Sequence, residues 1–565
     1  KSVYAFTESP EIHSGDEHFV IERYIRPRSI SPVRLKPGET LFIFPFNHKE
    51  KIAGQTYERI RNRLADLGLR TLLFLDEIDQ IVWDIEGKRA GAYIRERKPI
   101  QNSVWRVTLL GEEGQKTSEE DWLIFQQPVN DSNSNVEIAF SLGQDEKTKK
   151  DFIQPVNQSS LYAYFSTDKE TRLRFLIQGH YQTTPSRDNV LVDDEFNKLL
   201  ISETARLLIR SLEQLKSMGL LNADTLETMP LKSEHFPLGS FFRPLYEEFR
   251  KAMLTKDLLP SVDRKYIKAE EAKLARGTEL IQLLPAESLK ALFGYSKNYR
   301  WISDDITRDR TPELREFLMN AVNIEEIDPE KFARQITKEF LGSQSDEWMV
   351  KFYEFLDGQR ALWRPKSYST EGVLRNKPFI RTEDNKMTAP FDGAGNPLVF
   401  LPGSEETDFP VVKRNIINCE AALKFLNNLG LCEPDLVDEV LKFVLPRYTE
   451  KIIEVGEDVH LNDIKKIKNA LETATGTRKE RLLKQLLETP FLRAINPGNA
   501  QRAYRKPVEL YIDDEGLRTY FDGNPDVWFY DIIYVRFKKL LNPLLLCKKP
   551  HSTAVKYTAL WSLDK

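Results

Sequence analysis

Residues 193–219, DDEFNKLLISETARLLIRSLEQLKSMG, form the most strongly patterned stretch of the chain. Apolar residues recur every three or four positions, as they do along the buried face of an amphipathic helix. Asp193 or Asp194 offers a good N-cap, and Gly219 is a typical helix end. The pattern predicts one long helix. Its apolar face comprises Phe196, Leu199, Leu200, Leu207, Leu208, Leu212 and Leu215.

Two short apolar segments precede this helix. Residues 161–165 read LYAYF, and residues 175–181 read FLIQGHY. Short apolar runs bounded by polar turns are typical of strands, and a pair of strands that leads into a long helix predicts a compact α/β unit. The same reasoning predicts strands within 19–21, 38–44, 81–85 and 105–109, and a helix over 57–67 that stops at Gly68. Residues 122–125 and 136–140 are apolar segments between polar, Asn- and Lys-rich connections.

After Pro230 the pattern becomes mainly helical. Asp328-Pro329 predicts a helix start, because aspartate caps a helix and proline is tolerated in its first turn. The fold class expected for the whole chain is therefore α/β (α+β). The helix from Pro329 would carry Phe332, Ile336 and Phe340 and end at Gly342, and short strands are predicted at 378–380, 398–401, 508–512 and 528–534.

Composition excludes several classes of protein. The 565 residues include 82 basic and 86 acidic residues, which leaves a formal charge of −4 and no global positive field for nucleic acid. With 41% hydrophobic residues the chain is globular, and no apolar run is long enough to cross a membrane. Three scattered cysteines, Cys419, Cys432 and Cys547, indicate a reducing compartment and a cytoplasmic protein.

Residues 72–79, LLFLDEID, read as an apolar strand that ends in carboxylates. P-loop ATPases use such a strand to place an Asp beside magnesium and a Glu beside the attacking water. Asp76 and Glu77 would take these roles, but the chain has no G-x-x-x-x-G-K-[ST] motif to bind the phosphates. A buried strand followed by exposed acids is the interpretation we favour, and a truncated P-loop ATPase is an alternative.

Residues 183–189, TTPSRDN, form a predicted turn between a strand and the long helix. Arg187 lies in this rigidly flanked turn, where a fixed guanidinium group can stabilise charge on a phosphate. From the local sequence alone, an ion pair of Arg187 with Asp188, Asp193 or Glu195 is the simpler expectation.

The first fifteen residues, KSVYAFTESPEIHSG, resemble the stretch that follows the second glycine motif of GHKL ATPases, especially of the sacsin and plant NO VEIN-like branch. Residues 38–43, GETLFI, look like the Gly-Thr-x-Ile-x-Leu strand of that family. The similarity continues through residues 161–165, 175–177 and 185–188. Order and spacing carry this resemblance more than any single motif does.

The resemblance implies a role for each matching residue. Thr40 would lie in the adenine pocket, and Lys1 and Ser2 would follow the glycine motif of the nucleotide site. In the related ninety-kilodalton heat-shock chaperones, a Ser-Arg-Glu turn supplies an arginine that contacts the ATP γ-phosphate. Arg187 would be that sensor here, with Asp188 in place of the glutamate.

The expected function is that of an internal part of a large, ATP-dependent, chaperone-like GHKL ATPase. ATP and magnesium are the cofactors implied for the intact parent protein. The family's catalytic Glu, metal-binding Asn and adenine-reading motif would precede Lys1, so these 565 residues alone are not expected to bind ATP or to be active. Protein clients or partner subunits are the expected partners, and a non-catalytic scaffold is a further alternative.

The resemblance also suggests a division into four parts. Residues 1–100 would be the C-terminal half of the nucleotide-binding domain, and residues 101–222 a middle, transducer-like α/β domain. Residues 223–320 would form a helical connector, and residues 321–565 a mixed, mainly helical region.

Overall fold

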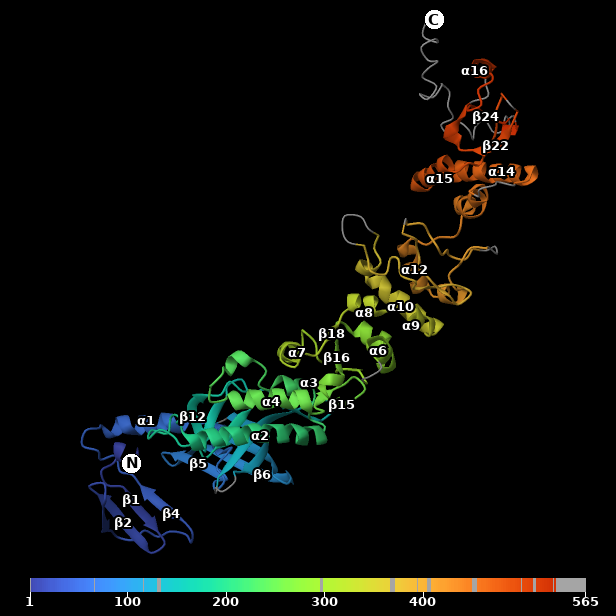
Figure 1. Cartoon of the computed structure of the whole chain (residues 1–565). Coiled ribbons are helices and arrows are strands. Elements are labelled where there is room, and N and C mark those ends of the chain that lie inside the picture. Colours follow the sequence, from blue (N-terminus) through green and yellow to red (C-terminus); the bar gives the residue numbers. More distant parts are fainter. Residues whose placement is uncertain are drawn as a thin grey trace, which may run out of the picture. The chain divides into compact units, whose positions relative to one another are not determined.

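The chain folds into two compact units, Lys1–Asp328 (unit 1) and Pro329–Lys565 (unit 2), in a computed structural model (Figure 1). Both units contain helices and strands, which confirms the mixed α and β fold class. Among the described residues, no helix has the length and apolar character needed to span a membrane. The structure describes residues 2–65, 67–114, 116–129, 134–294, 298–365, 371–393, 395–403, 408–449, 455–498, 500–511, 515–531 and 533–534.

Unit 1 begins with a small antiparallel sheet in the order β3-β2-β1-β4. Strands β2 and β4 cover the segments predicted around Phe19 and Leu41, and the predicted helix follows them as α1. The elements are η1 (Ser2–Ala5), β1 (Glu11–Ser14), β2 (Glu17–Glu22), β3 (Arg26–Ser29), β4 (Thr40–Ile43) and α1 (Ala53–Ala65).

A nine-stranded sheet forms the centre of unit 1, in the order β12-β11-β13-β9-β8-β7-β6-β5 with β10 paired to β9. The boundary expected at residue 100 lies inside β6, which pairs with β7 from Gly91 to Gln101 with a register shift between Pro99 and Gln101, so the strands on both sides of this boundary belong to one sheet. The strands are β5 (Gln80–Ile85), β6 (Lys88–Gln101), β7 (Val104–Glu113), β8 (Lys116–Pro128), β9 (Asn135–Gln144), β10 (Asp151–Gln154), β11 (Ser160–Ala163), β12 (Phe165–Glu170) and β13 (Leu176–Gly179).

Both faces of this sheet bury apolar side chains. Along β8, Leu123 and Phe125 join the core that contains α2, whereas Trp122 and Ile124 join a second core on the opposite face. Alternate residues of a strand point to opposite faces, so a strand that is buried on both sides loses the alternation of apolar and polar residues.

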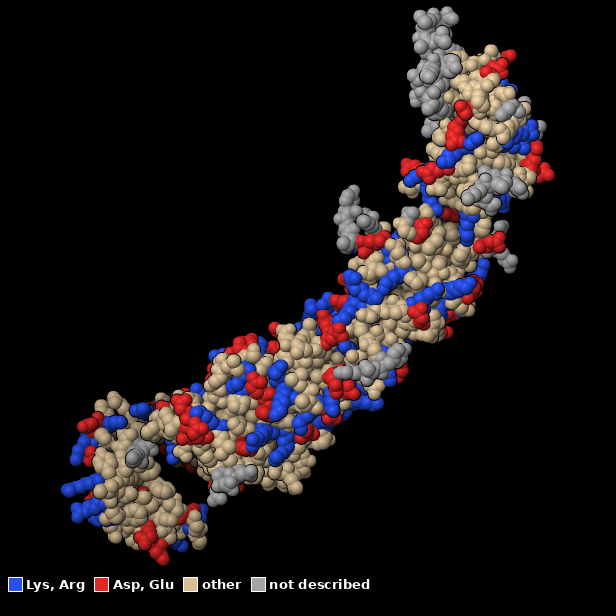
Figure 2. Space-filling model, viewed as in Figure 1, with Lys and Arg blue, Asp and Glu red and all other residues tan. Residues whose placement is uncertain are grey.

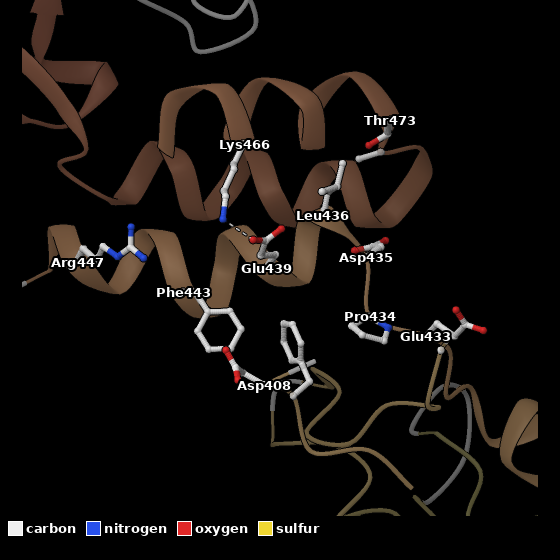
Figure 3. A pocket seen from close by; sticks show the side chains of 13 residues that line it. Asp408, Glu433, Pro434, Asp435, Leu436, Glu439, Phe443, Arg447, Lys466 and Thr473 are labelled. Carbon is white, nitrogen blue, oxygen red and sulfur yellow. Dashed lines mark hydrogen bonds and ion pairs between the residues drawn. The ribbon is translucent and has the colours of Figure 1, made fainter. Parts of the chain in front are cut away.

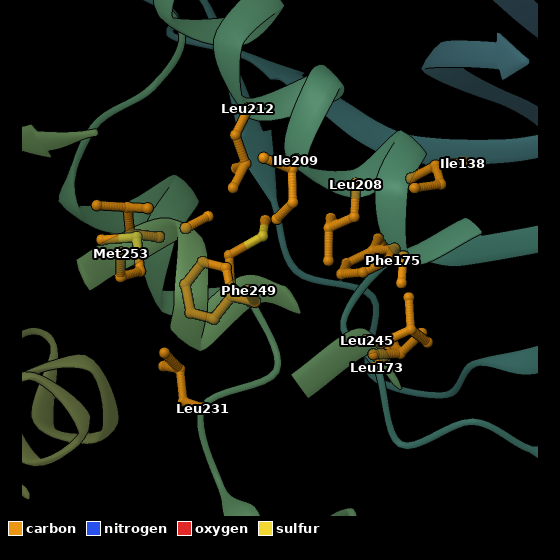
Figure 4. Packing of buried hydrophobic residues seen from close by; sticks show 14 of the residues in the cluster. Ile138, Leu173, Phe175, Leu208, Ile209, Leu212, Leu231, Leu245, Phe249 and Met253 are labelled. Atoms are coloured by element: carbon orange, nitrogen blue, oxygen red, sulfur yellow. The ribbon is translucent and has the colours of Figure 1, made fainter. Parts of the chain in front are cut away.

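Helix α2 (Glu195–Ser217) confirms the long predicted helix, although Leu199 of the predicted apolar face is 43% exposed. The Asp194 side chain accepts a hydrogen bond from the Asn197 N–H at 2.9 Å, and Gly219 follows the helix with a left-handed φ of 72°. Leu208 and Leu212 of α2 pack with Phe249 of α4 (Arg243–Thr255) and with Phe175 next to β13 (Figure 4).

The remaining elements of unit 1 share this core. Leu314 and Phe317 of α7 are buried in the same cluster as the sheet and α2, so the expected connector over 223–320 packs as part of the α/β unit. The elements are α3 (Ala223–Glu227), η3 (Ser233–His235), β14 (Leu259–Pro260), β15 (Tyr266–Ile267), η4 (Ala269–Glu271), β16 (Ala272–Ala275), α5 (Thr278–Leu283), α6 (Ala286–Phe293), β17 (Arg300–Trp301), α7 (Pro312–Asn320) and β18 (Glu326–Ile327).

Unit 2 is mainly helical, with several short strands. Its first predicted helix is divided into α8 and α9, because the Thr337 side chain caps the second helix by accepting from the Phe340 N–H at 3.1 Å. The elements are α8 (Pro329–Gln335), α9 (Lys338–Gly342), α10 (Asp346–Gly358), η5 (Arg360–Leu362), β19 (Ile380–Arg381), β20 (Met387–Thr388), α11 (Arg414–Ile417), α12 (Glu420–Leu429), α13 (Leu436–Glu439), the π-helix η6 (Val440–Val444), η7 (Leu445–Tyr448), α14 (Glu457–Thr473), α15 (Gly476–Glu488), β21 (Leu492–Ile495), β22 (Arg502–Arg505), η8 (Pro507–Glu509), β23 (Leu510–Tyr511), α16 (Glu515–Tyr520) and β24 (Trp528–Tyr530).

The late strands of unit 2 are shorter than predicted. Residues 398–401 contribute only an isolated bridge between Phe400 and Val411, whereas β23 and β24 occupy parts of the segments predicted at 508–512 and 528–534. Such short pairings are set by tertiary contacts more than by local pattern.

A buried polar chain runs through the core of unit 2. Tyr448 donates to a carboxylate oxygen of Asp463 at 3.0 Å, so its own oxygen accepts from His460 Nδ1 at 2.8 Å. His460 Nε2 then accepts from the Tyr534 hydroxyl at 2.6 Å, and that hydroxyl accepts the Arg493 N–H. This pattern requires neutral His460, and burial lowers the pKa of the imidazole to about 4.

Candidate functional site

The turn that carries Arg187 is closed by backbone hydrogen bonds. Thr183 and Val190 form a bridge, and the Thr184 N–H donates to the Asn189 carbonyl at 2.9 Å. Inside this frame, the Arg187 N–H donates to the Thr184 carbonyl at 2.9 Å. Pro185 occupies the second position of that turn, where its fixed φ is favourable.

Side chains and a neighbouring strand hold the turn further. The Asp188 carboxylate accepts from the hydroxyls of Thr184 at 2.7 Å and Ser186 at 2.6 Å, and these bonds lower its pKa. The Asp188 carbonyl also accepts the Asp168 N–H of β12 at 2.7 Å. The turn is therefore fixed at its base and at its tip.

The ion pair expected for Arg187 does not form. Asp188 bonds to the two hydroxyls, and Glu195 pairs with Lys198 at 2.8 Å. Within the described part of the chain, no carboxylate pairs with the Arg187 guanidinium, and the residue is exposed. A positive φ of 61° places Arg187 in the left-handed region, which costs a non-glycine residue roughly 1–2 kcal/mol.

The other nucleotide-binding candidates lie elsewhere. Thr40 begins β4 and is exposed, and its hydroxyl lies 2.8 Å from that of Ser14. Lys1 lies outside the described residues, and Ser2 contributes its backbone to η1 while its side chain is not described. Thr40 and Arg187 belong to different parts of unit 1, and no hydrogen bond or ion pair between described residues joins them.

The strand predicted at residues 72–79 is wrong. Residues Leu69–Leu72 form a 3-10 turn, η2, and Leu72 and Leu75 are buried against the sheet without joining it. The reason lies in Arg95 of β6, whose buried guanidinium donates to the carbonyls of Leu72, Leu75 and Asp76. An arginine from a distant strand thus provides the hydrogen bonds that a neighbouring strand would otherwise provide.

Asp76 also helps to hold residues 72–79 against β6. Its Oδ1 lies 2.7 Å from Nη1 of Arg97, and Asp79 Oδ1 lies 2.9 Å from Nη2 of Arg95. Glu77 is exposed. The two aspartates of the LDEID motif therefore anchor a turn to β6.

A carboxyl group that the sequence did not single out lies beside this anchor. Glu137 of β9 is 4% exposed, and its Oε1 is 4.0 Å from Nη2 of Arg97. Burial, followed by the charge of Asp76, raises the Glu137 pKa to about 7. Its only sequence signal is a charged residue inside the apolar run VEIAF.

Tyr164 and His180 complete this polar group. The Tyr164 hydroxyl lies 2.7 Å from His180 Nε2, and their stacked rings have centroids 5.0 Å apart. The charge of Asp76 acts on the pKa of both, and burial is the main cause of the lowered pKa of His180. Among the described residues, no three His, Cys, Asp or Glu side chains are grouped to hold a metal ion.

On the face seen in Figure 2, acidic and basic side chains are interspersed in both units.

Comparisons of the chain with protein-family models, with curated proteins and with solved structures find no match.

Proposed function

We propose that unit 1 is the phosphate-sensing part of a GHKL-type, chaperone-like ATPase, and that Arg187 is the sensor. The observation that supports this most is the state of the Arg187 side chain, which is exposed and not paired with any described carboxylate. An unpaired guanidinium on a rigid turn is available to an anion, and little of its hydrogen-bonding capacity is already used.

Backbone strain supports the same role. Arg187 holds a left-handed conformation that glycine adopts at no cost, and strained residues cluster at sites where the geometry has a use. The turn stands on a sheet and precedes a long capped helix. Such a scaffold limits the reorganisation needed when charge develops on a transferring phosphate.

ATP and magnesium fit the residues only in part. Arg187 would contact the γ-phosphate, and Thr40 has an exposed hydroxyl suited to a polar contact. The described residues contain no group suited to hold the metal. Bound ATP would supply a phosphate whose presence or absence changes the contact made by Arg187, and in this way would favour one of two domain arrangements.

The P-loop alternative is not part of the proposal. It needs residues 72–79 to be a strand that ends in free carboxylates, whereas Asp76 is paired with Arg97. A cytoplasmic location is part of the proposal and is supported by the free thiols of Cys419 and Cys432.

The proposal is tested by ATP turnover of the full-length protein that contains this chain. Arg187→Ala should lower turnover at least ~100-fold, as loss of a transition-state charge contact does. Arg187→Lys should restore only a fraction, because lysine lacks the planar fork.

Arg172→Ala is the matched control, since Arg172 is also exposed and has a φ of 58°. Normal turnover in the Arg187→Ala protein, or an equal loss in both alanine variants, would remove Arg187 from the mechanism.

A further inference from the structure

Unit 2 contains a cavity of about 880 Å³ (Figure 3). Asp408 and Glu433 lie on one side of the helical run that contains Glu439 and Phe443, and Phe409 also lines the cavity. The volume lies within the range of ligand-binding cavities. Its charged lining residues are Asp408, Glu433, Asp435, Glu439, Arg447 and Lys466.

The cavity has an excess of negative charge that its own cations do not neutralise. Lys466 pairs with Glu439 at 2.5 Å, and Arg447 pairs with the buried Asp463 at 2.7 Å. Both lining cations are therefore already engaged. Asp408 and Glu433 have no ion-pair partner among the described residues.

The ion pair of Asp435 does not remove the excess of negative charge in the cavity lining. Its carboxylate pairs with Arg478, which is shared with the buried Asp438 and also reaches the Cys432 sulfur at 3.1 Å. One guanidinium thus serves two carboxylates, and the lining keeps its negative excess.

Two aromatic rings form a wall beside Asp408. Phe409 and Phe443 meet with ring centroids 4.9 Å apart and an interplanar angle of 68°. The ammonium group of Lys442 lies 4.4 Å from the Phe409 centroid and 5.2 Å from that of Phe443. Burial lowers the pKa of Lys442, and the charge of Asp408 opposes that shift.

The position of Lys442 shows that the rings of Phe409 and Phe443 attract a cation. A cation above an aromatic face gains energy from the ring quadrupole, and a nearby carboxylate adds to the attraction. The chain's own ammonium group makes these contacts at the rings, while Glu433 lines the same cavity and has no ion-pair partner in the described part of the chain.

The helix geometry at this wall is unusual. Val440–Val444 form a π-helix, a conformation often found at functional sites. Pro446 has no N–H to donate to the Lys442 carbonyl, so regular α-helical bonding fails at this turn. Lys442 and Phe443 both belong to the irregular segment.

We propose that this cavity binds a basic peptide segment of a partner protein. Lysine or arginine side chains of that segment would pair with Asp408 and Glu433 and lie against Phe409 and Phe443, in competition with Lys442. Charge complementarity selects this occupant, because the unpaired groups of the lining are carboxylates. The proposal does not depend on the role of Arg187, which lies in unit 1.

The test uses the whole chain and a fluorescein-labelled octa-arginine peptide, with binding followed by anisotropy at two salt concentrations. Asp408→Asn with Glu433→Gln should weaken binding about tenfold, and the wild-type affinity should fall at high salt. The matched control is Glu354→Gln with Glu420→Gln, which removes the same charge from exposed positions of unit 2 outside the cavity.

Lys442→Met should change the peptide affinity in the opposite direction. It removes the ammonium group that competes with the peptide for the two rings, so binding should tighten several-fold. Lys351→Met, at an exposed site of α10, is the control and should not tighten binding. Thermal unfolding of each variant verifies that unit 2 is folded. Absence of wild-type binding, equal losses in the two double variants, or equal gains in the two lysine variants would overturn the proposal.

Discussion

The backbone N–H of Arg187 lies 2.9 Å from the carbonyl oxygen of Thr184, and this bond closes a turn in which Arg187 has a φ of 61°. Hairpin turns of this kind usually place glycine at the left-handed position. The chain instead retains an arginine there, with its side chain in solvent. Stability and function therefore favour different residues at this position, and they can be measured separately.

Arg187→Gly should preserve or increase the stability of unit 1, by up to ~1 kcal/mol, because glycine adopts the left-handed conformation without strain. The same substitution should abolish phosphate sensing along with Arg187→Ala. Thermal unfolding of the chain tests the first statement, and ATP turnover of the full-length protein tests the second. A glycine variant with a clearly lower unfolding temperature would contradict the strain assigned to Arg187.

Arg95→Met should release residues 72–79 from the sheet. The buried guanidinium donates to three backbone carbonyls and pairs with Asp79, and a hydrogen bond to a charged group contributes about 1.5–3 kcal/mol. Hydrogen exchange should increase over residues 69–79 and in β5. Asp76→Asn is the comparison, because its pair with Arg97 is half exposed and should contribute little. Equal exchange in both variants would argue against the attachment by Arg95.

Glu137→Gln should stabilise unit 1 in a pH-dependent way. The folded-state pKa of Glu137 is about 7, above its ordinary value of 4.5, so the fold favours the protonated carboxyl group. This preference is fully satisfied below pH 4.5 and is lost as the pH rises through 7. The glutamine variant should therefore gain about 2–3 kcal/mol at pH 8 and little at pH 4.5.

Urea unfolding at the two pH values measures that gain. Glu119→Gln is a control on β8, where the glutamate is exposed. A gain that does not change with pH would exclude titration of Glu137 as its cause.

His460 should make unit 2 sensitive to acid. Its folded-state pKa of about 4 lies below the ordinary value of 6.5, so the unfolded chain binds a proton that the fold excludes. The contribution is complete above pH 6.5 and is lost as the pH falls toward 4, by about 2–3 kcal/mol in total. His460→Gln should remove this slope, because an amide does not titrate. Hydrogen exchange of α14 across that range checks the effect, and an unchanged slope would assign it to another group.

Much of the fold was predictable because its signals are local. Asp194, the leucine spacing and Gly219 define α2 from residues a few positions apart, and the structure follows them. The division of the helix after Pro329 also had a local signal, in Thr337 three residues before Phe340. That signal was missed because the apolar spacing continues across the break.

Other features depend on residues that no local pattern connects. Residues 72–75 have the composition of a strand, but Arg95 bonds to their backbone from about twenty positions away. Glu137 is prominent only once the sheet brings Arg97 and Asp76 beside it. Asp188 does not pair with Arg187 because its carboxylate accepts hydrogen bonds from the Thr184 and Ser186 hydroxyls. The presence of acidic residues near Arg187 in the sequence does not reveal these bonds.

Strand β6 runs from Lys88 to Gln101, so a gene that is divided near residue 100 is divided within the central sheet. A cut near residue 100 would leave each of the two polypeptides with an unpaired edge strand. Each polypeptide should therefore aggregate when it is expressed alone. When both polypeptides are produced in one cell, β6 of one can pair with β7 of the other. The end of β6 is therefore a suitable place to divide the protein for a split reporter.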